Sequence, residues 1–248
     1  MVQTRIRAGL IDFGNTTHRF YLDRFFDGWL SRKSGIDGHH FWQLFSNYPD
    51  GFVYKFEVGG EPDEMVADFR NRLKGIYEEL SREFGRRVIP FEFTDEEFFE
   101  AWNSIFDLSS PDPNLMKFFR QLRGNGIKIF GFSNINKAHE KYLNGEGRKH
   151  RHTRFREYFI SVNRFIASCD NDVRARKTFL TQASREECEK MFRRGLEIAK
   201  TTPEETFFVD DIPGYVEVFK QMGGHSIVFS GNWTRVKSEL WNLGVRWE

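Results

Sequence analysis

The sequence predicts an α/β fold: a parallel β-sheet covered by helices, with a helical region inserted into it. Short apolar runs alternate with helical patterns along most of the chain, and this alternation builds a parallel sheet with both faces covered. Each apolar run ends in polar residues, which is typical of a buried strand entering a turn. Residues 17–108 differ, because helical patterns follow one another there with few β-type runs.

Five apolar runs predict the strands of the sheet. They are Ile6–Phe13, Ile127–Phe132, Arg164–Ala167, Thr206–Val209 and His225–Phe229. Ligands of an open parallel sheet bind outside the carboxyl ends of its strands. The polar residues that follow these runs are therefore the candidate functional residues, although each cluster taken alone is a weak signal.

Helical patterns with recognisable ends lie between the predicted strands. Asp112 and Pro113 supply a cap and a first-turn proline for a helix that Gly124 and Gly126 end, as caps and breakers do. A long apolar stripe predicts a helix from Phe179 to Ala199, and a further helix runs from Pro213 to Met222. The basic stretch Arg148–Arg156 is interpreted as a solvated loop rather than a phosphate or nucleic-acid patch.

The inserted region has helical patterns at Phe20–Leu30, Pro62–Phe84 and Thr94–Phe106. Thr94 and Glu97 have the spacing of a capping box. We expect residues 17–108 to form a helical cap over the carboxyl edge of the sheet, and residues 1–16 with 109–248 to form the core domain. The aromatic stretch from His39 to Phe56 either lines a substrate pocket or forms the core of the cap.

Composition excludes several classes of protein. The 248 residues include 28 Phe, 7 Tyr and 6 Trp, which is too much apolar surface for wholesale disorder. No apolar run approaches the ~18 residues of a membrane span, and a net charge of +1 argues against general nucleic-acid binding. Cys169 and Cys188 form neither a disulfide framework nor a zinc site. The first nine residues lack a secretory signal, so we expect a cytoplasmic protein.

Three of the polar strand ends carry a family resemblance. The run Leu10-Ile11-Asp12-Phe13-Gly14-Asn15-Thr16, the strand ending in Phe132-Ser133-Asn134 and the acidic pair Asp210-Asp211 before Ile212-Pro213 follow one another in order. This order resembles the haloacid dehalogenase-like (HAD) hydrolase superfamily, which implies a Rossmann-like core with an inserted helical cap. The first two motifs also resemble the branch of glucose-1-phosphate phosphatases and the N-terminal phosphatase domain of epoxide hydrolases.

The resemblance implies a magnesium-dependent phosphatase that acts on a small phosphorylated metabolite through an aspartyl-phosphate. Asp12 would be the nucleophile. Mg²⁺ would be held by Asp12, the backbone carbonyl of Gly14 and Asp211, with Asp210 in a supporting role. Ser133, Asn134, Gly14 and Asn15 would bind the phosphate, because amides at a helix N-terminus favour an anion. The expected site therefore comprises Asp12, Gly14, Asn15, Ser133, Asn134, Lys177, Asp210 and Asp211.

The sequence departs from the family at two places. Gly14 replaces the usual general acid, a group that contributes ~10² to 10⁴ in rate, so water, His39 or His40 would have to move the proton. The steadying lysine of the family has two placements: Lys177 precedes a helix as expected, whereas aligning Met191-Phe192 with the family's apolar pair puts Glu186 there. We favour Lys177, with Arg176 as its nearest substitute.

Two other functions remain open from the sequence. A HAD fold without its acid can serve as a binding or regulatory pseudophosphatase. A metal-independent haloacid dehalogenase also lacks the second acidic residue of the first motif. The adjacent carboxylates of Asp210 and Asp211 argue against the dehalogenase, because they repel each other unless a cation is present.

Overall fold

The computed structural model describes residues 5–45, 51–85, 87–107, 111–143, 153–170, 172–177 and 182–247. Within them lies a parallel five-stranded sheet in the order β3-β2-β1-β4-β5. The strands are β1 (Ala8–Ile11), β2 (Lys128–Ser133), β3 (Arg164–Ala167), β4 (Thr206–Asp210) and β5 (His225–Val228). The predicted α/β class and all five predicted strands are confirmed, with bounds that differ by at most two residues.

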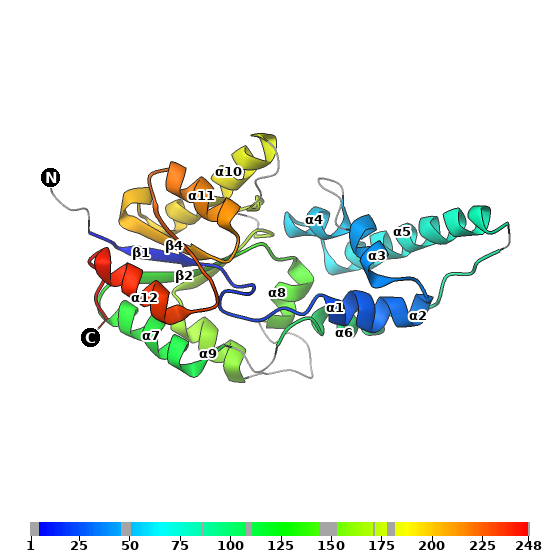
Figure 1. Cartoon of the computed structure of the whole chain (residues 1–248), viewed down its shortest axis with the longest axis horizontal. Helices are drawn as coiled ribbons and strands as arrows, with labels where there is room; N and C mark the ends of the chain where they lie inside the picture. The colour runs from blue at the N-terminus through cyan, green and yellow to red at the C-terminus, as the bar shows by residue number, and fades with distance from the viewer. Residues whose placement is uncertain are drawn as a thin grey trace.

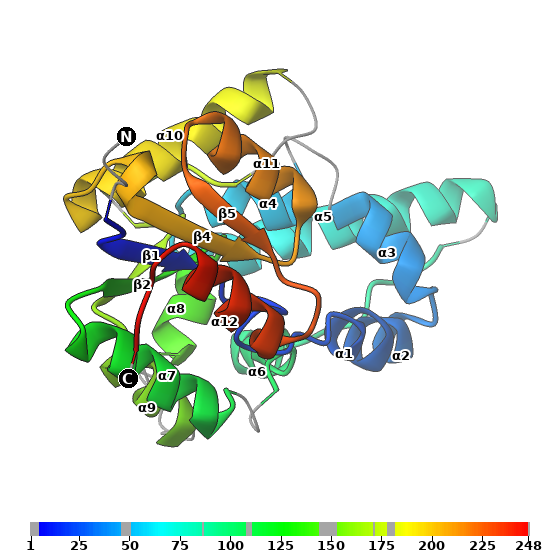
Figure 2. The same cartoon turned by 60° about the vertical axis from the view of Figure 1, so that its left-hand side comes forward.

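Helices cover both faces of the sheet (Figures 1 and 2). One face carries α7 (Pro113–Gly124), α9 (Thr153–Ser161) and α12 (Trp233–Asn242), and the other carries α10 (Gln182–Ala199) and α11 (Pro213–Gln221). Successive β1 side chains face opposite ways: Leu10 packs with Phe192 and Phe219, and Ile11 packs in the other cluster with Phe119 and Leu240. Burying a side chain of this size stabilises the fold by roughly 1.5–3 kcal/mol.

A second group of helices lies beyond the sheet, on the side toward which its strands point (Figure 1). This cap consists of α1 (Asp23–Phe25), a π-helical segment (Phe26–Ser31), α2 (Arg32–Ser34), α3 (Gly38–Phe45), α4 (Phe52–Glu57), α5 (Pro62–Glu83) and α6 (Asp95–Asn103). Both chain ends lie on the opposite side of the core. The inserted helical cap is thus where the sequence predicts it, while its exact boundaries at residues 17 and 108 stay a prediction.

Side-chain caps begin two of the predicted helices. The Asn114 amide donates to Asp112 Oδ1 at 2.8 Å at the start of α7. At α6, Glu97 N donates to Thr94 Oγ1 at 3.1 Å and Thr94 N to Glu97 Oε2 at 2.9 Å, which confirms the capping box. A cap of this kind is worth ~1 kcal/mol because it satisfies backbone amides that the helix cannot.

Four helices differ from the sequence prediction. We expected no helix at α3, α4 or α12, and the solvated-loop interpretation of residues 148–156 is wrong at 153–156, which lie in α9; residues 148–152 are outside the described residues. Tyr158 and Val162 of the α9 region are buried, and Arg120 Nη1 of α7 donates to Ser161 Oγ at 3.0 Å. Packing against α7 therefore outweighs the local charge.

The aromatic stretch from His39 to Phe56 contributes to the core of the cap. Phe41, Phe45, Phe52 and Phe56 are buried there, and Phe69 of α5 lies against two of these rings. Short helices separated by glycines hide this role, because a segment of six to eight residues contains too few turns for its periodicity to be read. No helix among the described residues is long and apolar enough to cross a membrane.

Candidate active site

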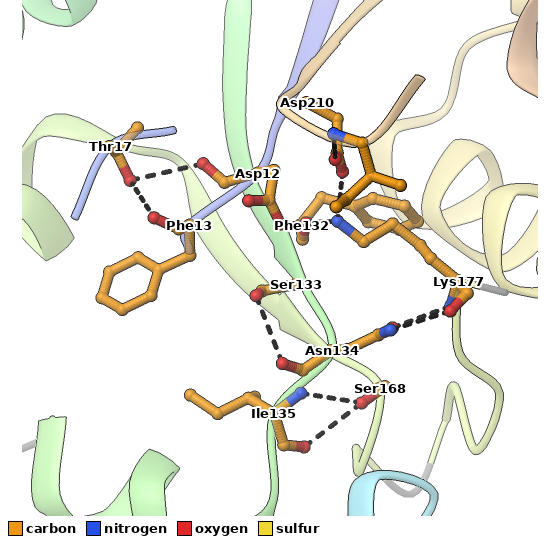
Figure 3. Close-up of polar contacts among 11 residues, drawn as sticks. Asp12, Phe13, Thr17, Phe132, Ser133, Asn134, Ile135, Ser168, Lys177 and Asp210 are labelled. Atoms are coloured by element: carbon orange, nitrogen blue, oxygen red, sulfur yellow. Dashed lines mark hydrogen bonds and ion pairs between the residues drawn. The ribbon is translucent and has the colours of Figure 1, made fainter. Parts of the chain in front are cut away.

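The carboxyl ends of β1, β2 and β4 bring the predicted motif residues to one place (Figure 3). β1 is the central strand and pairs with both β2 and β4. Asp12 follows β1 directly, and its amide donates to the Val209 carbonyl of β4 at 2.9 Å. Ser133 ends β2 and Asp210 ends β4, so the sheet register sets the three side chains at the same edge.

Lys177 provides the positive charge of this cluster. Its Nζ lies 2.5 Å from Asp12 Oδ1 and 2.5 Å from Asp210 Oδ2, and it also donates to the Phe132 carbonyl at 3.2 Å. The side chains of all three charged residues are at least nine-tenths buried. Lys177 reaches them from the segment between β3 and α10 (Figure 3).

The Asn134 side chain forms hydrogen bonds with both the backbone N–H and the backbone carbonyl of Lys177. Its Oδ1 accepts from Lys177 N at 2.7 Å, and its Nδ2 donates to Lys177 O at 2.8 Å. The side-chain amide that we expected at the phosphate is therefore engaged with Lys177, and only the backbone amide of Asn134 is left for that purpose. The two hydrogen bonds fix the segment that carries the lysine to the end of β2.

Ser168 supports the loop after β2, a role that the sequence did not reveal. Its amide donates to the Ser133 carbonyl at 3.0 Å, and its hydroxyl accepts from Ile135 N at 2.9 Å. Ser168 is fully buried just past the end of β3. Its only signal in the sequence is that position, a polar residue at a strand end. Ser133 itself is buried, with its hydroxyl 3.4 Å from the Asn134 carbonyl.

Burial disfavours the ionised carboxylates of the cluster. It raises the pKa of Asp12, an effect that the adjacent Lys177 charge opposes. It raises the pKa of Asp210 to about 7, with Lys177 opposing and Asp12 adding to the shift. Burial also raises the pKa of Asp211 to about 6, and the negative charge of Asp12 adds to the rise. Burial alone would lower the pKa of Lys177, but Asp12 and Asp210 raise it above its usual range, so the lysine stays charged.

Three carboxylates of the cluster could hold a metal ion. Asp12, Asp210 and Asp211 each offer an oxygen, and these oxygens lie within 4.8 Å of one another. Lys177 balances only one of their three negative charges, so a divalent cation would complete the neutralisation. Oxygen ligands of this kind suit a hard cation. The Gly14 carbonyl accepts from Thr16 N at 2.6 Å and, having two lone pairs, retains one for a metal.

Comparisons with known proteins give a structural match. No protein-family model and no curated protein matches the sequence. Among solved structures, a HAD-family enzyme of Bacteroides thetaiotaomicron, in complex with magnesium and inorganic phosphate, has a TM-score of 0.63 and 19% identity over 93% of this chain and 98% of its own. A predicted HAD-like hydrolase of Porphyromonas gingivalis has a TM-score of 0.61 and 20% identity, covering 95% of this chain and 98% of its own.

A third match is a HAD phosphatase of Thermococcus onnurineus, with a TM-score of 0.54 and 16% identity over 98% of this chain and all of its own. In all three, the match covers sheet and cap together. The chain has the HAD hydrolase fold. The predicted resemblance is confirmed at this level, while the closer likeness to glucose-1-phosphate phosphatases stays a prediction.

In the first motif of this chain, the ring of Phe20 occupies the space beside Gly14. A Cβ added at Gly14 would lie 2.9 Å from Phe20 Cε2, so the space beside Gly14 is filled. Asn15 makes this possible: it adopts a left-handed backbone with φ 52°, and its Oδ1 accepts from Phe20 N at 3.2 Å. The exposed side chain of Asn15 therefore shapes the turn, a function that we had not expected of it.

The structure distinguishes between the two positions predicted for the steadying lysine. Lys177 lies at Asp12, whereas Glu186 is exposed on α10. Arg176, the predicted substitute, points elsewhere: its guanidinium pairs with Glu57 of the cap and Glu187 of α10. Residues 178–181, where we expected the helix to begin, are outside the described residues, and α10 begins at Gln182.

Proposed function

We propose that this protein is a magnesium-dependent phosphatase that hydrolyses a small phosphorylated metabolite through an aspartyl-phosphate on Asp12. The observation that carries the proposal is the group formed by Asp12, Asp210 and Asp211, whose oxygens lie within 4.8 Å of one another beside Lys177. The structural relative from Bacteroides thetaiotaomicron, which is in complex with magnesium and phosphate, adds support. A cytoplasmic location remains a prediction.

In this proposal, Asp12 attacks phosphorus with the carboxylate oxygen that Lys177 does not contact, while Oδ1 stays with Lys177. Lys177 favours the ionised form of Asp12, because the ammonium charge opposes the desolvation that raises the carboxylate pKa. Asp210 keeps the lysine in place: one of its oxygens contacts Lys177 Nζ and the other accepts from Ile212 N at 2.8 Å. Its role is therefore to support the lysine as well as the metal.

Asp12, Asp211 and the Gly14 carbonyl would hold Mg²⁺. When bound, the ion would neutralise the charge that meets between the nucleophile and the phosphoryl oxygens. The Ser133 hydroxyl and the backbone amides that follow it would bind those oxygens near the start of α8 (Lys137–Leu143). The Ser168 hydrogen bonds described above keep this loop in shape before the substrate arrives, so binding need not order it.

The test is hydrolysis of p-nitrophenyl phosphate. We expect turnover with Mg²⁺, loss with EDTA, and loss of at least about 10³-fold in Asp12→Asn, since removing a nucleophile removes the covalent route. Asp172→Asn is a matched control, because this exposed aspartate pairs with Arg164 and not with the cluster. Turnover that survives in both EDTA and Asp12→Asn would refute the proposal.

A pseudophosphatase is the second candidate, and the filled space beside Gly14 favours it. In that case the protein binds Mg²⁺ and inorganic phosphate but turns over no ester. Isothermal titration with both ions, together with the hydrolysis assay, separates the two functions. Release of chloride from a haloacid without metal would favour the dehalogenase instead.

A further inference from the structure

The proposed phosphatase needs a proton donor that the first motif does not supply. Alkoxide leaving groups are poor, so a general acid must protonate them as the bond to phosphorus breaks. At position 14 there is no side chain, and the Phe20 ring fills the adjacent space. A donor must therefore reach the substrate from another side, and the cap is the part of the molecule that faces the carboxyl edge of the sheet (Figure 1).

Glu57 is an acidic side chain of the cap held at this boundary. It is the last residue of α4, and only 16% of its side chain is exposed. Its Oε2 lies 3.6 Å from Arg176 Nη1 and accepts no hydrogen bond among the described residues. Arg176 is covalently joined to Lys177, whose Nζ contacts Asp12. Arg176, which pairs with Glu57, and Lys177, which pairs with Asp12, are therefore neighbours in the chain.

Arg176 is itself fixed, which determines where Glu57 lies. Its guanidinium carbon is 4.0 Å from the centre of the Tyr54 ring in α4, and its Nε lies 3.6 Å from Glu187 Oε1 in α10. The side chain of Arg176 is 3% exposed. A stacked, buried guanidinium is a rigid reference point, so Glu57 is oriented by the core although it belongs to the cap.

We propose that Glu57 is the general acid and base of the reaction, taking the place of the carboxylate missing at position 14. This inference rests on the proposed phosphatase activity. In the first step, the bond from phosphorus to the leaving oxygen breaks as Asp12 bonds to phosphorus, and the proton of Glu57 passes to that oxygen. In the second step, the Glu57 carboxylate takes a proton from the water that attacks the aspartyl-phosphate, which releases phosphate and restores both residues.

The electrostatics of Glu57 suit both steps. Burial raises its pKa to about 7, and the charges of Arg176 and Lys177 oppose the rise while Glu187 adds to it. The charge of Glu57 also adds to the rise in the pKa of Tyr215 of α11. Tyr54 lies on α4, the helix that carries Glu57. A carboxyl group with a pKa near the working pH can both give and take a proton. The earlier candidates fit less well: His39 is exposed on α3, and the His40 side chain lies outside the described part.

The experiment compares two esters in three proteins. p-Nitrophenolate leaves with little need for a proton, whereas the alkoxide of glycerol 2-phosphate needs one. We expect Glu57→Gln to lower kcat/KM for glycerol 2-phosphate by ~10²-fold or more and for p-nitrophenyl phosphate by much less. Glu187→Gln, which removes the other carboxylate at Arg176, should keep the ratio of the two rates.

A positioning role would lower both rates together and would overturn the proposal. The pH profile adds a second readout: with the alkyl ester the wild-type rate should fall as Glu57 ionises at rising pH, and Glu57→Gln should lack this limb. Should Glu57→Gln fail to fold, Glu57→Asp keeps the carboxyl group one methylene further back, and its rate ratio should lie between those of wild type and a protein without acid.

The proposal and the function beneath it fail in different ways. Wild-type protein that hydrolyses p-nitrophenyl phosphate but not the alkyl ester would overturn Glu57 as the acid and leave the phosphatase standing. Wild-type protein that hydrolyses neither ester with Mg²⁺ would overturn both.

Discussion

Arg176 and Lys177 are neighbours in the chain, and each is the centre of a buried charged cluster. The two clusters are built differently. At Lys177 the cation contacts Asp12 and Asp210 at 2.5 Å, and every partner belongs to the core. At Arg176 the two ion pairs are 3.6 Å long, and one partner, Glu57, belongs to the cap. The first cluster is closed within the core, whereas the second depends on the position of the cap.

The difference shows how a cap can take part in chemistry that is anchored elsewhere. The Lys177 cluster has an excess of negative charge that a metal could neutralise. In the Arg176 cluster, Glu57 Oε2 accepts no hydrogen bond from the residues that the structure describes. A carboxylate whose ion pair is long changes its protonation at a smaller cost than one held by short contacts.

The largest expected difference between the clusters is in stability. Lys177→Met would leave Asp12 and Asp210 buried without their cation, and breaking such a pair costs roughly 3–5 kcal/mol. Arg176→Met should cost less, because its ion pairs are longer and Glu57, whose pKa burial raises to about 7, can take up a proton. Urea unfolding at neutral pH measures both. An equal or larger loss in Arg176→Met would contradict this ranking.

The pH dependence of stability should locate Glu57. Its pKa is about 7 in the folded chain against 4.5 ordinarily, so folding favours the protonated form, and stability falls as pH rises from about 4.5 to about 7. Glu57→Gln removes this loss. The stability of the variant relative to wild type should therefore increase between pH 5 and pH 8, by on the order of 3 kcal/mol at most.

Urea unfolding of both proteins at the two pH values gives this difference. Glu187→Gln serves as the control for loss of a carboxylate at Arg176, because Glu187 is the other ion-pair partner of that guanidinium. The same relative stability of Glu57→Gln at both pH values would place the titration of Glu57 outside this range.

Magnesium should act on the core cluster and not on the cap boundary. At a concentration 100-fold above its dissociation constant, Mg²⁺ should stabilise the wild type by about 2.7 kcal/mol. Asp211→Asn should lose most of that effect, while Glu187→Gln should keep it. Thermal unfolding with and without Mg²⁺ measures the shift. Equal stabilisation of Asp211→Asn would remove this residue from the proposed ligands.

The smallest expected effect concerns the space beside Gly14. A Cβ there would approach the Phe20 ring to 2.9 Å, so Gly14→Ala should cost ~1–3 kcal/mol through overpacking. Gly75→Ala is the matched control, because a Cβ at that position of α5 meets nothing within 4 Å and alanine favours the helix by ~0.5–1 kcal/mol. Urea unfolding that shows no loss in Gly14→Ala would mean that this side of the site is open.

Local pattern was sufficient for the sheet and for several helix ends. The strands are short apolar runs followed by polar residues, and the cap at Asp112 and the capping box at Thr94 involve partners two or three residues apart. Interactions over such distances are determined by the sequence nearby. The helices α3 and α4 were missed because segments of six to eight residues contain too few turns for a period to be read. The helix α12 was missed although Asn232 caps it and Val236 and Leu240 lie on one buried face.

By itself, the sequence determined the order of the strands along the chain and the carboxylates and hydroxyl at their ends, since parallel strands bring those ends to one edge. Only the tertiary structure decided which groups meet there. Lys177 contacts the carboxylate of Asp12, 165 residues away in the chain. Asn134 accepts a hydrogen bond from the backbone of Lys177, 43 residues away, and Glu57 of the inserted region pairs with Arg176. Spacing along a chain carries no information about such contacts, because they form only when separate elements pack together.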